Sequence, residues 1–227
     1  MDDPNLDPAL HRQALRGLKR INWVTNSIRA VWQEIKTLSK SYSSSSPLSI
    51  LDVACGSGDS LIRIGKLAKA ADFDVRLTGM DISPVAIAST SLNAMKANVE
   101  LATIESDALS EQPFPQHDVV FCSLFLHHLD DSQALLLLRK MRSGGKHLVL
   151  VSDLLRSWSG YLLAVAGTRL LSRSRIVHID GPRSVEAAFT ESEFQKLCGE
   201  AEMANGAVRG FWPQRFLFRW EPDNEPS

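Results

Sequence analysis

The sequence predicts an α/β protein built on a doubly wound, mostly parallel sheet, and three observations support this prediction. Apolar runs rich in β-branched residues alternate with segments of helical periodicity between residues 48 and 152. A glycine turn follows the first apolar run, as in sheets that bind ligands beyond the carboxyl ends of their strands. The chain closes with two short strand-like runs around Pro213, which indicates an antiparallel hairpin.

The bulk composition narrows the class of protein. The chain has 227 residues, of which 44% are hydrophobic and 22% charged, values typical of a globular domain. Its net charge is −1, so no overall excess of basic residues points to nucleic acid. The three cysteines are far apart and form no CxxC pair, which argues against a disulfide framework and a metal site. With neither a signal peptide nor an apolar run long enough to span a membrane, we expect a cytoplasmic protein without an integral membrane segment.

Residues 1–46 are predicted to form a helical cover and a serine-rich linker. Apolar residues between positions 9 and 40 recur at helical spacing, which indicates one buried helix face. Residues 39–47 are rich in serine and are expected to be a flexible linker. The basic helix either packs on the main domain with its charges solvated, or covers the active site and meets an acidic ligand or a lipid surface. The main domain is expected to occupy residues 47–227.

The main domain is predicted to begin with five strands and the helices that join them. The predicted strands are residues 48–54, 74–80, 98–104, 117–123 and 146–152. The predicted helices are residues 59–70, 84–97 and 130–142, the last with an acidic start at Asp130 and a stop at Gly144. In such sheets ligands bind beyond the carboxyl ends of the strands, so function is expected there.

The last third of the chain departs from this alternation. Residues 157–172 are predicted to be an amphipathic helix, and residues 190–203 a helix that begins with a capping box at Thr190 and Glu193. Two final strands are expected at residues 206–211 and 215–220. The segment between the fifth strand and the second of these helices, about residues 156–185, is expected to be an insert that contacts substrate.

The motif after the first strand reads Asp52-Val53-Ala54-Cys55-Gly56-Ser57-Gly58, and acids also follow the second and third strands, at Asp81 and Asp107. Glycines let the backbone approach a nucleotide-like ligand at a helix N-terminus. Together these motifs resemble those of the class I S-adenosylmethionine-dependent methyltransferases, in the small-molecule branch that includes quinone-biosynthesis enzymes. The resemblance implies a seven-stranded Rossmann-like sheet with an antiparallel last strand. Ala54 stands where many members have the first glycine.

The resemblance also implies which residues bind S-adenosylmethionine. Asp52 would act on the ammonium of its methionine part, Asp81 would bind the ribose hydroxyls, and Ile82 would pack on the adenine. Asp107 would bond the adenine amino group, and Ser123 would lie beside the methionine part. The cofactor-binding candidates are therefore Asp52, Ala54, Cys55, Gly56, Gly58, Asp81, Ile82, Asp107, Ala108 and Ser123.

Two neighbouring histidines, His127 and His128, follow the fourth strand, where many members of that family carry a similar histidine. Transfer of a methyl group to oxygen or nitrogen benefits from a base that works near neutral pH, and histidine fits that role. Both are therefore candidate catalytic residues. The alternative is that one of them only hydrogen-bonds the loop backbone.

The insert combines aromatic residues with several arginines, a composition that suits an amphiphilic acceptor such as a phenolate or carboxylate of aromatic, polyketide or quinone type. The candidate substrate-binding residues are Arg156, Tyr161, Arg173 and His178. The alternative is that the aromatic residues belong to the core and the arginines are solvated.

Two rival functions stay open. An NAD-dependent oxidoreductase needs a third glycine, but Leu61 occupies that position. The other rival is a protein that binds S-adenosylmethionine but has lost catalysis. The presence of Asp52, Asp81 and Asp107 argues against it. We expect a methyltransferase whose partner is a small molecule and not a nucleic acid, with no metal ion.

Overall fold

The fold is described from a computed structural model, which describes residues 27–41, 46–171 and 175–222. Its centre is a seven-stranded sheet with the order β3-β2-β1-β4-β5-β7-β6. The strands are β1 Leu48–Val53, β2 Val75–Asp81, β3 Ala102–Glu105, β4 His117–Ser123, β5 Gly145–Leu154, β6 Ala207–Phe211 and β7 Arg215–Trp220. The first five strands pair in parallel, and β7 runs antiparallel to both β5 and β6. The predicted fold and its terminal hairpin are confirmed.

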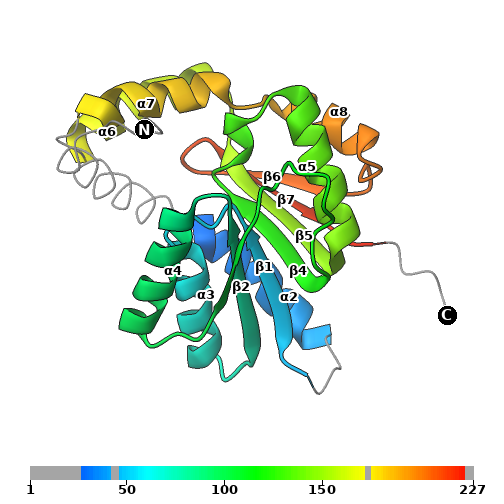
Figure 1. Ribbon diagram of the computed structural model, residues 1–227. Helices are drawn as coiled ribbons and strands as arrows, with labels where there is room; N and C mark the ends of the chain where they lie inside the picture. The colour runs from blue at the N-terminus through cyan, green and yellow to red at the C-terminus, as the bar shows by residue number, and fades with distance from the viewer. Residues whose placement is uncertain (1–26, 42–45, 172–174, 223–227) are drawn as a thin grey trace.

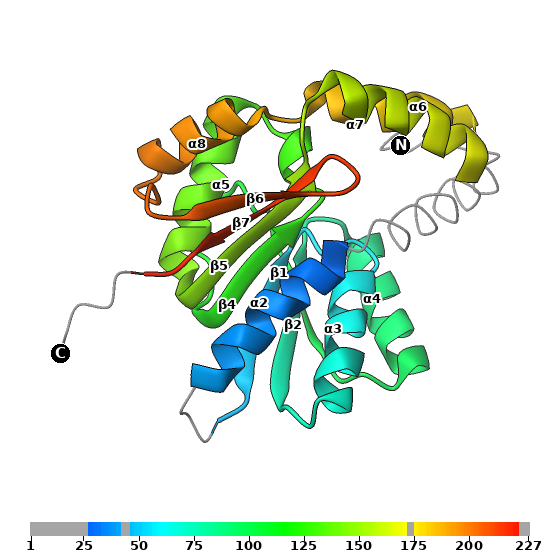
Figure 2. The same ribbon diagram turned by 180° about the vertical axis from the view of Figure 1, so that it is seen from behind.

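Helices cover both faces of the sheet (Figures 1 and 2). On one side lie α2 Ser27–Ser41, α3 Asp59–Ala70 and α4 Pro84–Ala97, and on the other α5 Asp131–Gly144 and α8 Glu191–Glu200. Each layer buries its own apolar cluster. Val31 and Ile35 of α2 pack with β1, β4 and β5 on one face, whereas Leu138 of α5 and Phe194 of α8 pack on the other. Parallel strands buried on both faces explain the continuous apolar runs in the sequence.

Local signals set the starts of several helices. The Asp130 side chain accepts a hydrogen bond from the backbone N–H of Gln133, whose side chain bonds back to Asp130. Thr190 and Glu193 form the same reciprocal pair at the start of α8, as predicted. Each pair satisfies backbone donors that a helix start would otherwise leave without partners.

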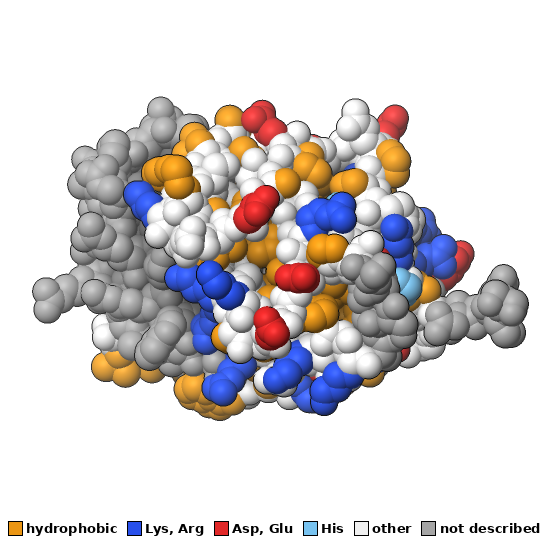
Figure 3. Space-filling view, turned by 90° about the horizontal axis from the view of Figure 1, so that it is seen from below, with side chains coloured by type: hydrophobic (Ala, Val, Ile, Leu, Met, Phe, Trp, Pro, Cys, Tyr) orange, Lys and Arg blue, Asp and Glu red, His pale blue; other side chains and the backbone are white. Residues whose placement is uncertain are grey.

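Helices α6 Trp158–Leu171 and α7 Arg175–Ala187 lie side by side beyond the carboxyl ends of the strands (Figure 1). Gly181 of α7 faces α6 so closely that a Cβ there would come within 2.4 Å of the Thr168 Cγ2 atom. The opposite end of the molecule carries basic and acidic side chains interspersed with one another (Figure 3). The helix pair therefore lies at the end of the sheet where α/β proteins bind their ligands.

Two local predictions need correction. The expected linker starts too early, because α2 continues to Ser41. No helix is predicted over residues 175–187, where the structure has α7, although Pro182 removes one backbone donor from that helix. The sequence reads as a turn there because Gly181 precedes a proline, but packing of Gly181 on α6 favours the helix. The predicted helix before residue 27 and the linker residues 42–45 lie outside the described residues.

A membrane-spanning helix and a metal-binding group are both absent from the described residues, 27–41, 46–171 and 175–222. None of the helices in those ranges is both long and apolar enough to cross a membrane. Nor do three or more His, Cys, Asp or Glu side chains in those ranges come together in a group that could hold a metal ion.

Candidate active site

The loop between β1 and α3 has an unusual backbone. Ala54, Gly56 and Gly58 have φ angles of 58°, 56° and 75°, the left-handed region that favours glycine. A Cβ at Gly58 would lie 2.7 Å from the Thr90 Cγ2 atom, whereas one at Gly56 would meet nothing within 4 Å. Gly58 is therefore needed for packing inside the protein, and Gly56 leaves open the space in which a ligand would approach the loop.

Side chains of α4 hold this loop in place. The Thr90 hydroxyl donates a hydrogen bond of 2.8 Å to the Gly56 carbonyl, and the Asn93 amide donates one of 3.1 Å to the Ser57 carbonyl. The Cys55 thiol is buried against Thr90, and burial raises its pKa to about 12, so it stays protonated near neutral pH. The loop is thus preorganised without a ligand.

Asp81, at the end of β2, is tied to the same loop. Its Oδ2 atom accepts a hydrogen bond of 2.9 Å from the Gly56 N–H, and its Oδ1 atom accepts one of 2.9 Å from the Ser83 N–H. Each carboxylate oxygen can accept a further bond, so the residue can bind ligand hydroxyls while its orientation stays fixed. Ile82 beside it is 64% exposed, so its side chain is accessible to a ligand bound at this edge of the sheet.

Asp52 lies within β1, before the loop that contains Gly56, and is only 2% exposed. Burial, and then the nearby charge of Asp81, raise its pKa well above the ordinary value for an aspartate. A cationic group bound close by would offset both effects. Asp52 therefore has the properties of a buried acid that suits an ammonium.

The loop after β3 carries Asp107 and Ala108. Asp107 is exposed and accepts a hydrogen bond of 2.8 Å from the Leu109 N–H, and Ala108 is buried beside it. From α5, the Lys140 amine donates a hydrogen bond of 2.7 Å to the Ser110 carbonyl and lies 4.5 Å from the centre of the Phe114 ring. Lys140 is a supporting residue that sequence reasoning missed.

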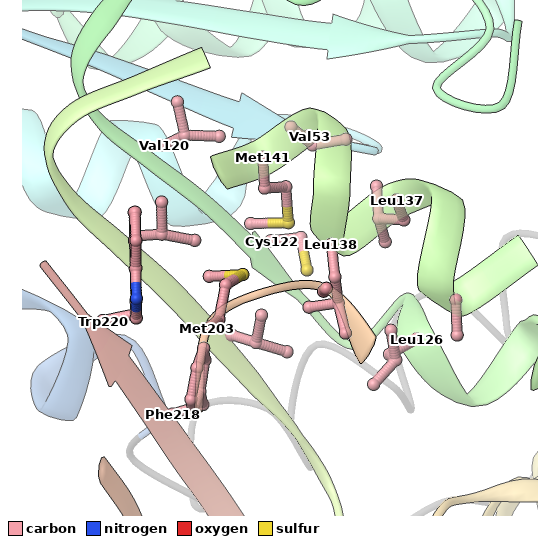
Figure 4. Close-up of a cluster of buried hydrophobic side chains, with 14 of the residues drawn as sticks. Val53, Val120, Cys122, Leu126, Leu137, Leu138, Met141, Met203, Phe218 and Trp220 are labelled. Carbon is pink, nitrogen blue, oxygen red and sulfur yellow. The ribbon is translucent and has the colours of Figure 1, made fainter. Parts of the chain in front are cut away.

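The turn after β4 places the two histidines differently. Ser123 ends β4, and the short 3₁₀ helix η1 Leu126–His128 follows. Leu126 is fully buried among Leu137 and Leu138, which fixes the position of η1 on the core (Figure 4). His127 is only 8% exposed, whereas His128 is exposed, with the two ring centres 4.1 Å apart.

His127 makes a short contact with a buried carboxylate. Its Nδ1 atom lies 2.6 Å from the Oδ1 atom of Asp153, near the end of β5. Burial by itself would raise the pKa of Asp153, but the His127 charge and hydrogen bonds from His127, Leu154 and Leu126 outweigh it and lower that pKa. Asp153 is thus ionised and accepts a proton-bearing Nδ1. The sequence carried one signal for Asp153, its place at the end of the fifth strand.

The predicted substrate residues are less closely grouped. Tyr161 stacks on Trp158, with ring centres 5.8 Å apart, and Trp158 is 75% exposed. His178 is half-buried on α7, the helix that contacts η1. Arg156 pairs with Glu193 of α8, which engages its guanidinium in a contact within the fold. Arg173 lies outside the described residues.

Comparisons with known proteins show what the chain is similar to. Residues 50–146 match a family described as a methyltransferase domain. The chain is 29% identical over 164 residues to a ubiquinone biosynthesis O-methyltransferase of Alkalilimnicola ehrlichii, a match that covers 71% of this chain and 62% of that protein. A protein of the same name from Psychrobacter cryohalolentis is 25% identical over 201 residues, covering 84% of this chain and 72% of its own. The chain thus spans about three-fifths of the first relative's length.

The fold itself is shared with solved structures. One is the plantazolicin methyltransferase BamL, solved in complex with a triazolic desmethylPZN analogue and SAH. It superposes with a TM-score of 0.69 at 17% identity, over 94% of this chain and 90% of its own. The matches confirm the resemblance that the motifs predict, because residues 50–146 match a methyltransferase domain and the fold is that of a solved methyltransferase.

Proposed function

We propose that this protein transfers a methyl group from S-adenosylmethionine to a hydroxyl of a small aromatic acceptor of quinone or polyketide type. One observation carries the proposal: a glycine loop tied to Asp81 and a histidine paired with Asp153 occupy the same edge of one sheet. A donor site and a candidate base are therefore neighbours, as methyl transfer to a weakly acidic group requires.

On the donor side, each residue has a distinct task. Gly56 admits the ligand to the loop backbone, Asp81 accepts hydrogen bonds from the ribose hydroxyls, and Asp52 faces the ammonium of the methionine part. Ile82 packs on the adenine, and Asp107 bonds its amino group. The exposure of Ile82 and the free space above Gly56 support this arrangement.

The donor supplies a reactive sulfonium, so the protein's own residues mainly align the reactants and manage one proton. His127 takes the proton from the acceptor hydroxyl, and α6 and α7 position the acceptor. The name shared by the two relatives, ubiquinone biosynthesis O-methyltransferase, supports an oxygen acceptor on an aromatic ring. The stacked Trp158 and Tyr161 on α6 support an aromatic one.

Calorimetry and a transfer assay test the proposal. S-adenosylhomocysteine should bind with micromolar affinity or better, and NAD should not bind. Transfer of a labelled methyl group from S-adenosylmethionine should then occur to at least one member of a panel of catechols, hydroxybenzoates and hydroquinones. Binding of NAD alone would favour an oxidoreductase. Tight S-adenosylhomocysteine binding with no transfer to any panel member would favour a protein that has lost catalysis.

A further inference from the structure

We propose that Asp153 is a positioning residue that holds His127 as the general base for a hydroxyl acceptor, and that His128 does not serve as the base. This inference rests on the proposed function. The contact between the two residues spans 26 positions of sequence and joins the turn after β4 to the end of β5. The sequence motifs do not show that His127 pairs with Asp153, and they do not distinguish His127 from His128 as the base.

Asp153 is itself held rigidly. It is 1% exposed, its Oδ2 atom accepts a hydrogen bond of 2.7 Å from the Leu126 N–H, and its Oδ1 atom accepts one of 2.6 Å from the Leu154 N–H. These backbone donors come from the chain on both sides of the site. The carboxylate therefore cannot rotate away from His127 without breaking several bonds, and it fixes the plane of the imidazole ring.

The pairing decides the tautomer of His127. Because Asp153 is an ionised acceptor, the proton of the neutral imidazole resides on Nδ1, and Nε2 keeps its lone pair. Among the residues that the structure describes, none makes a hydrogen bond to Nε2 of His127. This nitrogen is thus available to accept a proton from an acceptor.

A second buried histidine provides the contrast. At the opposite end of β4, His117 uses both ring nitrogens inside the protein, with Nδ1 2.9 Å from the Pro115 carbonyl and Nε2 3.1 Å from the Thr78 hydroxyl. A histidine that only stabilises a fold is expected to look like His117. His127 has the same degree of burial but uses one nitrogen, and the other is left for chemistry.

Other charged and titratable groups surround the pair. Arg215 of β7 and Cys122 of β4 both interact electrostatically with Asp153, and His128 lies against the His127 ring. His178 and Asp180 belong to α7, the helix that contacts η1. Arg215 is nearly fully buried, and its positive charge favours the ionised form of Asp153.

The chemical step balances with these groups. The acceptor O–H proton passes to Nε2 of His127 while the oxygen forms a bond to the methyl carbon and the bond between that carbon and the sulfonium sulfur breaks. The sulfur leaves as a neutral thioether. The resulting imidazolium is stabilised by Asp153 and later loses its proton to water.

The test compares two acceptors of different acidity. Catechol keeps its proton at pH 8, whereas 4-nitrocatechol is already ionised there and needs no base. In Asp153→Asn and in His127→Gln, the rate constant kcat with catechol should fall about 10²–10⁴-fold. With 4-nitrocatechol it should fall less than about 10-fold. Asp118→Asn is the matched control, since Asp118 is a buried acid at the opposite edge that accepts bonds from Ser49.

A purely structural role for Asp153 would reduce both rates by the same factor, and that result would overturn the proposal. His127→Gln leaves the backbone bonds of Asp153 in place, so it keeps the test valid should Asp153→Asn fail to fold. Loss of activity in His128→Gln equal to that in His127→Gln would also overturn the proposal.

A second measurement does not depend on finding an acceptor. In ¹⁵N NMR spectra at pH 8, the wild-type His127 ring should carry its proton on Nδ1, and Asp153→Asn should shift the proton towards Nε2. If neither catechol is methylated, the proposed acceptor class fails, and the spectra still decide the pairing. An unchanged tautomer in Asp153→Asn would refute the role of Asp153.

Discussion

In the proposed donor region, the loop after β1 accepts hydrogen bonds from Thr90 and Asn93, donates one to Asp81, and contains three residues of positive φ. At the acceptor end, the helix α6 presents Trp158, Leu162 and Leu170 with most of their surface exposed. The family match over residues 50–146 includes the first region and stops before the second. Under the proposed function, the first region binds the methyl donor that the family shares, and the second binds the acceptor of this particular protein.

The two regions differ in the contacts that hold them rigid. Backbone bonds to buried or half-buried side chains hold the donor loop in one geometry before a ligand arrives. Helix α6 is tied to the sheet at its start, where the Ser157 hydroxyl donates a hydrogen bond to Gln214 in the β6–β7 turn and accepts one from the Gly160 N–H. Substitutions should therefore affect stability and donor affinity at the first end, and acceptor use at the second.

The largest expected effect on stability is at Gly58. Gly58→Ala should lower the free energy of unfolding by about 2–4 kcal/mol, because a positive φ and an overlap with Thr90 both oppose the new Cβ. Gly56→Ala, whose Cβ meets no protein atom, should cost about 1–2 kcal/mol but weaken S-adenosylhomocysteine binding. Denaturant unfolding and calorimetry separate the two. Equal losses of stability in both variants would contradict the packing role of Gly58.

Asp81 is expected to have the next largest effect. Asp81→Ala should weaken S-adenosylhomocysteine binding by about 2 kcal/mol, or roughly 30-fold, because ribose hydroxyls and the Gly56 N–H lose a charged acceptor. Arg156→Ala, at the acceptor end, is the control and should leave that affinity unchanged. An unaltered affinity in Asp81→Ala, measured by calorimetry, would mean that the ribose contact is wrongly assigned.

Asp52 should show opposite effects on stability and binding. The folded protein raises its pKa, so stability is fully present below the ordinary aspartate pKa and is lost as pH rises through the raised one. Asp52→Asn should therefore increase the free energy of unfolding at pH 8 by about 1 kcal/mol or more, since an ionised buried carboxylate is costly. This gain should vanish near pH 4.

The matching measurement is the thermal shift caused by S-adenosylhomocysteine. The ammonium of that ligand loses its partner in Asp52→Asn, so the ligand should raise the melting temperature less than in the wild type. A variant that is no more stable at pH 8 than at pH 4, relative to the wild type, would show that Asp52 is not under electrostatic strain.

A substitution at Ala54 is expected to increase the stability of the fold. It has a φ of 58°, at a position where many members of the family have glycine. Ala54→Gly removes the left-handed strain and adds some flexibility to the unfolded chain, for a net stabilisation of about 0.5–1 kcal/mol. Urea unfolding at pH 7 measures it. A destabilised Ala54→Gly variant would mean that the alanine methyl group contributes packing that exceeds the strain.

The smallest effect on stability is expected at the acceptor end. Trp158→Ala should change the free energy of unfolding by less than about 0.5 kcal/mol, since the side chain is largely exposed. It should raise KM for an aromatic acceptor several-fold and leave S-adenosylhomocysteine affinity unchanged. A loss of donor affinity in this variant would remove the distinction between the two ends.

The fold was predictable because its signals are local. Three helices and five strands in the first part of the chain follow from alternation, periodicity and caps such as Asp130, and α8 follows from its cap at Thr190. Helix α7 was missed because Gly181 and Pro182 together resemble a turn, whereas in the structure Gly181 packs closely against Thr168 of α6. The end of α2 was misplaced for a related reason, since serines suit both linkers and helix ends.

The sequence by itself determined the order of strands and helices, the glycine turn and the acids at the strand ends, because each depends on neighbouring residues. The tertiary structure decided what those residues meet. It buried Asp52, tied Asp81 to Gly56, engaged Arg156 with Glu193, and paired His127 but not His128 with Asp153. Such contacts join positions far apart in the chain, and their energies depend on burial and distance, which no local pattern contains.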